Sequence, residues 1–128
     1  MFNHLMIGSN NIEKSRKFYN ATFKALGVPE AADGPNGRLV YAHDGNRMLI
    51  TKPLNGEPAT GANGGTIGFK AASAEQVKAW HDAGVANGGT SVEDPPGPRE
   101  NAIGKIYLAY LRDPDGNKLC ASYKYPAA

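Results

Sequence analysis

Two side chains near opposite ends of the chain could do chemistry together. His4 lies in an apolar stretch expected to form the first strand, and Cys120, the only cysteine, lies in the last expected strand. A thiol activated by an imidazole can act as a nucleophile or a redox group, and the pair also offers two donors to zinc or copper. Buried cysteines usually pack as small apolar residues, so the sequence leaves a structural role open for Cys120 between Leu119 and Ala121.

The other two histidines are weaker candidates for a catalytic role. His43 sits beside an expected hairpin turn, where exposure to solvent is the default. His81 lies on the expected second helix, at the edge of its apolar side. Neither histidine has a partner at a spacing that predicts a catalytic triad.

The elements that must position these side chains occur twice. A shift of 62 residues lays His4 on Thr66, and a shift of 71 lays Asp44-Gly45-Asn46 on Asp115-Gly116-Asn117. The larger second shift indicates an insertion in the second half. Each unit is expected to fold as a strand, a helix and two or three further strands, which leaves one sheet face uncovered until a second unit packs against it.

An amphipathic helix is expected after the first strand of each unit. Apolar residues recur with the helical period over residues 12–26 and again over residues 74–86. The expected caps are Asn10 or Asn11 with Glu13 for the first helix, and Ser73 with Gln76 for the second. Both apolar stripes are interpreted as core rather than as ligand sites.

Strands are expected to fill most of the remaining sequence. They are predicted at residues 2–8, 38–42, 48–52, 65–71, 106–111 and 118–123. The motif Asp113-Pro114-Asp115-Gly116-Asn117 is expected to be the turn between the last two strands. The segment at residues 93–99 contains three prolines, so we expect it to be a loop over the open side of the sheet rather than a central strand.

Composition fits one soluble domain and excludes several classes of protein. With 128 residues, the chain is expected to form a single domain over 1–128, with module one at about 1–55 and module two at about 63–128. Its net charge of +2 comes from scattered basic residues, unlike a nucleic-acid-binding surface. The single cysteine favours a reducing compartment, and the first eight residues resemble neither a signal peptide nor a membrane span. We therefore expect a cytoplasmic protein that binds a small molecule, not nucleic acid or a membrane.

The order of these motifs resembles the vicinal oxygen chelate superfamily, which includes glyoxalase I, bleomycin and fosfomycin resistance proteins and extradiol dioxygenases. The matching pieces are His4, Phe18-Tyr19, Leu26-Gly27, the strand at residues 65–69, Gly88-Gly89, Pro98-Arg99 and the turn at residues 113–117. Together they cover nearly the whole chain. The resemblance implies an α+β fold, in which two βαβββ modules form a curled, cup-like mixed sheet with flanking helices. It also implies a homodimer, because members of the superfamily often pair across the open edges of these modules.

In that superfamily the first and last strands of each module hold a divalent metal, which acts as a Lewis acid or activates dioxygen. The matching positions here are His4, Leu49, Thr66 and Cys120. Only His4 is a standard ligand, while Cys120 adds a soft donor and His43 could add a third if it came close. Catalytic zinc needs three protein ligands, and non-haem iron needs two histidines and a carboxylate. The resemblance therefore implies a degenerate site for zinc, nickel, manganese or iron, and the sequence assigns no cofactor.

The same resemblance suggests which side chains contact a ligand. Relatives often carry an arginine in the Pro-Gly-rich loop and an aromatic residue in the next strand. The expected substrate contacts are Arg47, Leu49, Thr66, Arg99 and Tyr107. We expect a protein that binds a small molecule in a cup centred on His4, Thr66 and Cys120. The alternative is a metal-dependent lyase of the lactoylglutathione type, an isomerase or a dioxygenase, with His4 and Cys120 as catalytic residues, and the sequence leaves enzymatic activity open.

Overall fold

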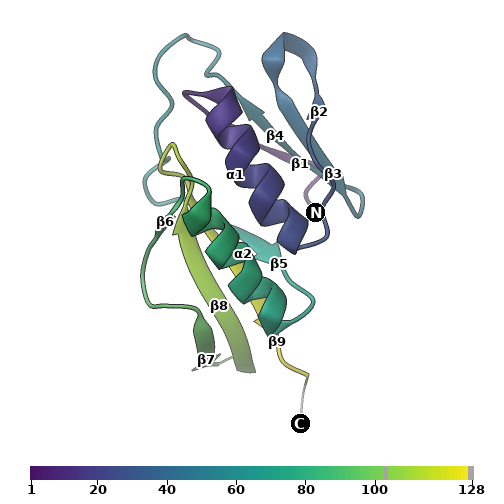
Figure 1. The fold of residues 1–128 in the computed structure, drawn as a ribbon, viewed down its shortest axis with the longest axis vertical. Coiled ribbons are helices and arrows are strands. Elements are labelled where there is room, and N and C mark those ends of the chain that lie inside the picture. Colours follow the sequence, from purple (N-terminus) through teal and green to yellow (C-terminus); the bar gives the residue numbers. More distant parts are fainter. Residues whose placement is uncertain (103, 127–128) are drawn as a thin grey trace.

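The computed structural model describes residues 1–102 and 104–126, which form two α-helices and two mixed sheets (Figure 1). The elements of module one are β1 (His4–Gly8), α1 (Ile12–Ala25), β2 (Ala32–Asp33), a short 3₁₀ helix (Pro35–Gly37), β3 (Leu39–His43) and β4 (Asn46–Thr51). Those of module two are β5 (Ile67–Lys70), α2 (Ala74–Ala86), β6 (Thr90–Ser91), β7 (Gly97–Asn101), β8 (Gly104–Arg112) and β9 (Lys118–Lys124). The predicted α+β class is confirmed.

Each module forms its own sheet. Sheet A has the strand order β1-β4-β3-β2, and sheet B has the order β5-β9-β8, with β6 and β7 both pairing with β8. In both sheets the first strand of the module runs parallel to the last, and the remaining pairs are antiparallel. The repeat seen in the sequence is therefore also a repeat of strand order. It leaves β1 and β5 as edge strands.

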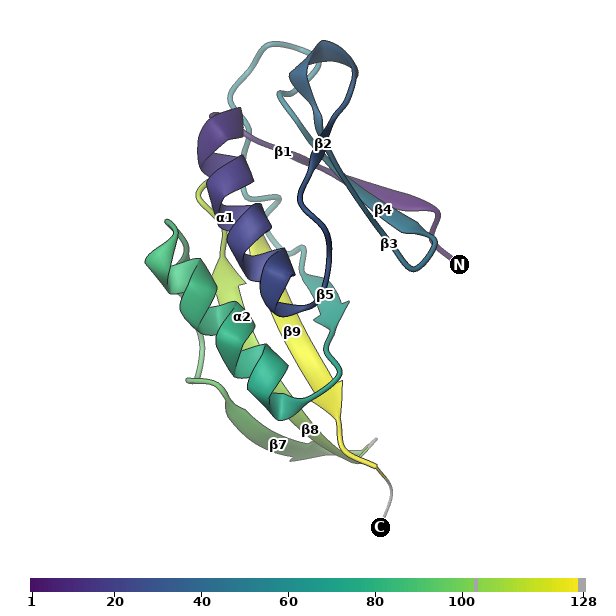
Figure 2. The same ribbon diagram turned by 45° about the vertical axis from the view of Figure 1, so that its right-hand side comes forward.

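Side chains alternate between the two faces of each sheet, and burial distinguishes these faces. The buried residues of the inner faces are Leu39, Tyr41, Met48 and Ile50 in sheet A, and Ala109, Leu111, Leu119 and Ala121 in sheet B. They join the apolar sides of α1 and α2 in one core. Among the described residues, no helix covers the opposite face of either sheet, here called its outer face (Figures 1 and 2).

The two helices lie side by side, with α2 over sheet B and α1 beside sheet A (Figures 1 and 2). Their close approach depends on Gly84, where a Cβ atom would overlap the Leu111 side chain and lie 3.2 Å from the Phe18 ring. Phe23 on α1 joins the modules, because its ring centroid lies 4.9 Å from that of Tyr41 in sheet A and 5.1 Å from that of Phe69 in sheet B.

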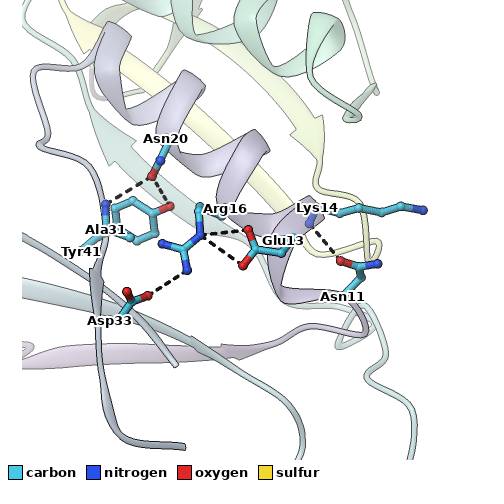
Figure 3. A network of polar contacts seen from close by, with 8 residues as sticks. All are labelled: Asn11, Glu13, Lys14, Arg16, Asn20, Ala31, Asp33 and Tyr41. Atoms are coloured by element: carbon cyan, nitrogen blue, oxygen red, sulfur yellow. Dashed lines mark hydrogen bonds and ion pairs between the residues drawn. The ribbon is translucent and has the colours of Figure 1, made fainter. Parts of the chain in front are cut away.

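Polar contacts fasten α1 to its own sheet (Figure 3). The Arg16 guanidinium donates to Asp33 on β2 at 2.8 Å and also pairs with Glu13 one turn earlier. The Asn20 side-chain oxygen accepts from the Tyr41 hydroxyl at 2.7 Å and from the backbone N–H of Ala31 at 3.2 Å. These contacts connect α1 to β2, to β3 and to the segment before β2.

The turn at residues 113–117 does more than join two strands. Asp113 is buried, and its Oδ1 accepts from the backbone N–H groups of Asp115 and Asn117, both at 2.9 Å. Its Oδ2 accepts from the Tyr19 hydroxyl at 2.6 Å and from the Asn117 amide at 2.9 Å. The Asn117 amide also donates to the carbonyl of Gly8 at 3.3 Å. The turn of module two therefore holds the end of β1 and the middle of α1.

The structure differs from the sequence-based expectations in three local features. Residues 97–101 form the edge strand β7 rather than only a loop, which is compatible with Pro98 because an edge strand need not use every backbone N–H. Asn11 caps α1, and Glu13 pairs with Arg16 instead of completing a capping box. For α2, Ser73 is the cap as expected, but the Gln76 side chain accepts from the N–H of Ala72 rather than from that of the cap.

Candidate functional site

The outer faces of the two sheets carry most of the residues that the sequence singles out. The β1–β4 register pairs His4 with Arg47 and Met6 with Leu49, so these four side chains share the outer face of sheet A. In sheet B, Cys120 pairs with Gly68 and Tyr110, and Arg99 pairs with Ile106 on the same face. Thr66 lies immediately before β5 and is exposed.

The structure places the predicted site residues on two separate sheets. His4, Arg47 and Leu49 belong to sheet A, whereas Cys120 and Arg99 belong to sheet B. Tyr107 lies on the inner face, where it pairs with Tyr123 and packs against the core. Tyr107 therefore does not share the outer face with Cys120 and Arg99, and its contact with a ligand stays a prediction. Tyr110, three residues further along β8, lies on the outer face instead.

A cluster of polar side chains surrounds Tyr110 on the outer face of sheet B. The Lys118 Nζ lies 5.1 Å from the centroid of the Tyr110 ring and forms an ion pair with Glu93. Cys120 faces Tyr110 across the β8–β9 pair. The charge of Arg99 also acts on the Tyr110 hydroxyl. Neither Lys118 nor Glu93 is suggested by the sequence, because the Glu93 segment is expected to be a loop and its return to the sheet is a tertiary feature.

Two side chains of this cluster have raised pKa values. Burial, followed by the negative charge of Glu93, raises the pKa of the Cys120 thiol, and the charge of Lys118 opposes this only in part. Burial also raises the pKa of the Tyr110 hydroxyl. Both groups are therefore protonated and neutral near pH 7. A nucleophilic cysteine requires the opposite shift, so this environment favours a packing or ligand-contact role for Cys120.

On sheet A, one side chain links the two candidate polar residues. The Asn3 side-chain oxygen lies 2.9 Å from His4 Nδ1 and 3.0 Å from Arg47 Nη2. Both His4 and Arg47 are exposed, and Arg47 makes no ion pair within the described residues. This end of the outer face therefore carries a positive charge without a carboxylate partner.

The residues at the family's four metal positions do not fit a firmly held divalent cation. Leu49 offers no donor, and Thr66 offers a neutral hydroxyl, which is a weak ligand. His4 and Cys120 are the strong donors, but they lie on different sheets. Across residues 1–102 and 104–126, no three His, Cys, Asp or Glu side chains come close enough together to hold a metal ion.

His81 lies at the edge of the core, as expected, and makes two side-chain hydrogen bonds. Its Nε2 lies 2.8 Å from the Ser91 hydroxyl, and its Nδ1 lies 3.3 Å from an Asp82 oxygen. The side chain is nearly buried between α2 and β6. These bonds connect the helix to the edge of sheet B, away from the Tyr110 cluster, which lies on the other face.

Neither helix of the described chain has the length and apolar content that a membrane span requires.

Comparisons with known proteins agree with the fold. A crystal structure of a glyoxalase/bleomycin resistance protein from Albidiferax ferrireducens T118 is 52% identical to this chain, with a TM-score of 0.93, and the match covers 97% of this chain and 99% of that one. A glyoxalase-related enzyme from Fulvimarina pelagi has the same fold at 18% identity and a TM-score of 0.73, over 100% of this chain and 92% of that one.

A family enzyme from Burkholderia phytofirmans PsJN also shares the fold, at 17% identity and a TM-score of 0.73, over 96% of this chain and 98% of that one. No curated protein matches the chain. The sequence model of the Glyoxalase/Bleomycin resistance protein/Dioxygenase superfamily matches residues 1–121, which is nearly all of the sequence. The predicted glyoxalase-like fold is therefore confirmed, and the chain belongs to the glyoxalase/bleomycin resistance protein/dioxygenase superfamily.

Proposed function

We propose that the protein binds a small anionic molecule with an aromatic or apolar part, and that the outer face of sheet B is the centre of this site. The observation that carries the proposal is the cluster around Tyr110. It combines an aromatic ring, two cationic side chains and a neutral thiol on one sheet face. Such a surface can contact the apolar part of a ligand through the ring and the anionic part through Arg99 or Lys118.

The charges on this face favour an anion. Its strand residues include five cations and no acid: Lys70, Arg99, Arg112, Lys118 and Lys124. The nearby acid is Glu93, which is already paired with Lys118. Arg99 donates to the backbone carbonyls of Pro95 and Pro98 and makes no ion pair within the described residues. Its planar guanidinium is therefore available for a carboxylate or phosphate.

We also propose that a second copy of the chain covers this face. Ile106, Leu108 and Tyr110 alternate along β8 on the outer face, and all three are only partly buried in a single chain. Removing these apolar side chains from water would favour association. Covering them with sheet A of a partner would bring the partner's His4 and Leu49 toward Cys120, which is how a homodimer would form the predicted cup.

A metal-dependent lyase, isomerase or dioxygenase activity is the alternative that family membership suggests. Its metal would need at least three strong donors, and the described chain supplies two on separate sheets. No other observation favours this activity over binding.

The binding proposal can be tested by titrating the full chain with phenyl phosphate and following the backbone amide resonances by NMR. We expect shifts around Tyr110, Cys120 and Arg99. Arg99→Gln should weaken binding by about tenfold to 100-fold, because a hydrogen bond to a charged group contributes about 1.5–3 kcal/mol. Lys14→Gln, which makes the same charge change on the exposed side of α1, should leave binding unchanged. Equal losses of phenyl phosphate affinity in Arg99→Gln and Lys14→Gln would overturn the proposal. Shifts of backbone amide resonances only outside sheet B would also overturn it.

The dimer requires a separate measurement. Light scattering during size-exclusion chromatography should give a mass near 27 kDa, which is twice the 13.6 kDa of one chain. Leu108→Glu should shift the protein toward the monomer, because it places a charge on the apolar strip of β8. A wild-type monomer at high protein concentration would refute the dimer. The phenyl phosphate titration would then still test the binding proposal independently.

A further inference from the structure

A groove separates the two modules on the inner side of sheet A. Its volume is about 530 Å³, and it is bounded by sheet A, the end of α1, the edge strand β5 and the start of α2. Small-molecule pockets usually have volumes of roughly 300–1,000 Å³. The groove does not include Tyr110, Cys120 or Arg99, so it is distinct from the cluster on the outer face of sheet B.

Aromatic rings form much of the groove. Three of the four phenylalanines of the chain line it, namely Phe2, Phe23 and Phe69, together with Tyr41. Phe23 meets the rings of Tyr41 and Phe69 at interplanar angles of 67° and 87°, with centroids 4.9 and 5.1 Å apart. These are edge-to-face contacts, and another flat ring can extend such an arrangement.

The buried and exposed linings of the groove differ in polarity. The buried part is apolar and consists of Phe23, Leu26, Tyr41, Met48 and Ala71. The Tyr41 hydroxyl already donates to Asn20, so it requires no ligand. The exposed part, here called the mouth, carries the charged and imidazole side chains. A ligand that fits both parts has an apolar body and a polar end.

The charges at the mouth favour an anion. Arg47 and Lys70 are exposed there, and neither forms an ion pair within the described residues. The one acid that lines the groove is Asp44, and its carboxylate lies 3.5 Å from His43 Nδ1. The mouth therefore has two cations for one partly compensated carboxylate. A carboxylate ligand matches this balance and the donor geometry of a guanidinium.

We propose that the groove is a second ligand site, which takes a flat aromatic carboxylate. The aromatic ring of the ligand packs among Phe23, Phe69 and Met48, and its carboxylate meets Arg47 or Lys70 at the mouth. The site lies within one chain and does not depend on the function proposed for sheet B. It joins the two modules, so an occupied groove also resists their separation.

The experiment uses naphthoate as the probe and naphthamide as its neutral counterpart. The full chain is titrated with each probe, and backbone amide resonances are followed by NMR. We expect naphthoate to shift amides in residues 44–48 and 67–72. Naphthamide should bind about fivefold to tenfold more weakly, because it lacks the charge-assisted hydrogen bond.

Two variants locate the probe. Arg47→Gln should weaken naphthoate binding about fivefold or more and should leave naphthamide binding unchanged. Lys14→Gln is its control, with the same change of charge on an exposed position of α1. Ala72→Trp places a large side chain at an exposed position of the lining and should block both probes. If Ala72→Trp does not fold, the comparison of Arg47→Gln with Lys14→Gln still shows whether naphthoate binds at the mouth.

Several results would overturn the proposal. Naphthoate shifts confined to residues 106–122 would assign the probe to the outer face of sheet B, which would support the first proposal and refute this one. Equal affinity for naphthoate and naphthamide would refute the role of the mouth. Shifts in residues 67–72 that depend on protein concentration, and not on probe, would show that a second copy occupies the groove.

One result would instead support two separate sites. In Arg99→Gln, phenyl phosphate binding would be lost while naphthoate binding is retained.

Discussion

The Tyr19→Phe substitution tests whether the turn at residues 113–117 holds the two modules together. It removes one hydroxyl from a side chain with 0% exposure, and the ring that packs in the core stays. The lost hydrogen bond runs to the carboxylate of Asp113 at 2.6 Å. A hydrogen bond to a charged group contributes about 1.5–3 kcal/mol. Asp113 keeps its three other donors, so we expect the free energy of unfolding at neutral pH to fall by about 2 kcal/mol.

The loss should depend on pH, because Asp113 is a buried acid. Burial raises the pKa of its carboxyl above the ordinary value of 3.8, and the hydrogen bond from Tyr19 is the largest effect that lowers it. A carboxyl with a raised pKa in the folded state stabilises the fold below its unfolded pKa, and this contribution is lost as the pH rises through the folded pKa. Without the Tyr19 hydroxyl the folded pKa rises further. The difference between wild type and variant should therefore be smaller at acid pH and larger at neutral pH.

Urea unfolding is followed by the fluorescence of Trp80 and gives the free energy of unfolding of wild type and variant. Measurements at neutral pH and at about pH 4 give the pH dependence of their difference. Thermal unfolding should show a midpoint lower by roughly 6–10 °C at neutral pH. The control is Tyr123→Phe, which removes a hydroxyl from a partly buried ring of sheet B and should change stability by less than about 0.5 kcal/mol. A Tyr19→Phe loss as small as that of the control, or one that is equal at both pH values, would refute this role of the turn.

Three further outcomes follow from the structure. Alkylation of Cys120 by iodoacetamide should be slow near pH 7 and accelerate only in alkaline solution, because burial and Glu93 raise the thiol pKa. Glu93→Gln should move this acceleration to lower pH. Rapid alkylation of the wild type near pH 7 would contradict the burial of the thiol. Gly84→Ala should destabilise the fold by about 1–3 kcal/mol in urea, because its methyl group overlaps Leu111, and unchanged stability would mean that the helices can separate without cost. Elemental analysis of protein purified without chelator should find metal well below one equivalent per chain, and His4→Ala should not change this amount. One equivalent in the wild type that is lost in His4→Ala would show that the donors of this chain are sufficient to bind a metal ion.

Much of the fold is predictable from local sequence because its signals are local. Asn11 and Ser73 cap their helices through hydrogen bonds to residues three positions later, and the apolar stripes of both helices repeat with the helical period. The turns with Asp-Gly-Asn mark where the antiparallel strands reverse. The family resemblance follows from the order of these same signals, and it needs no knowledge of which residues touch.

The candidate site was less predictable because it depends on strand pairing. Tyr107 and Tyr110 are both plausible ligand contacts in sequence, but they lie on opposite faces of β8, and only the register with β9 shows which one faces the helices. A shift of one residue in that register would exchange the two faces. The same limit applies to Glu93, which is distant in sequence from Lys118 and Tyr110 and reaches them through the path of the segment before β7.

The sequence by itself determined that this protein has a duplicated α+β fold of its superfamily, and that only His4 is a standard ligand among the four positions where relatives hold a metal. These properties depend on residue identity and short-range spacing. Only the tertiary structure decided that Asp113 binds Tyr19, that His4 and Cys120 lie on different sheets, and that a groove lined by aromatic rings separates the modules. The physical reason is that burial, register and the approach of distant segments depend on how all the elements pack together, and no local signal in the chain encodes them.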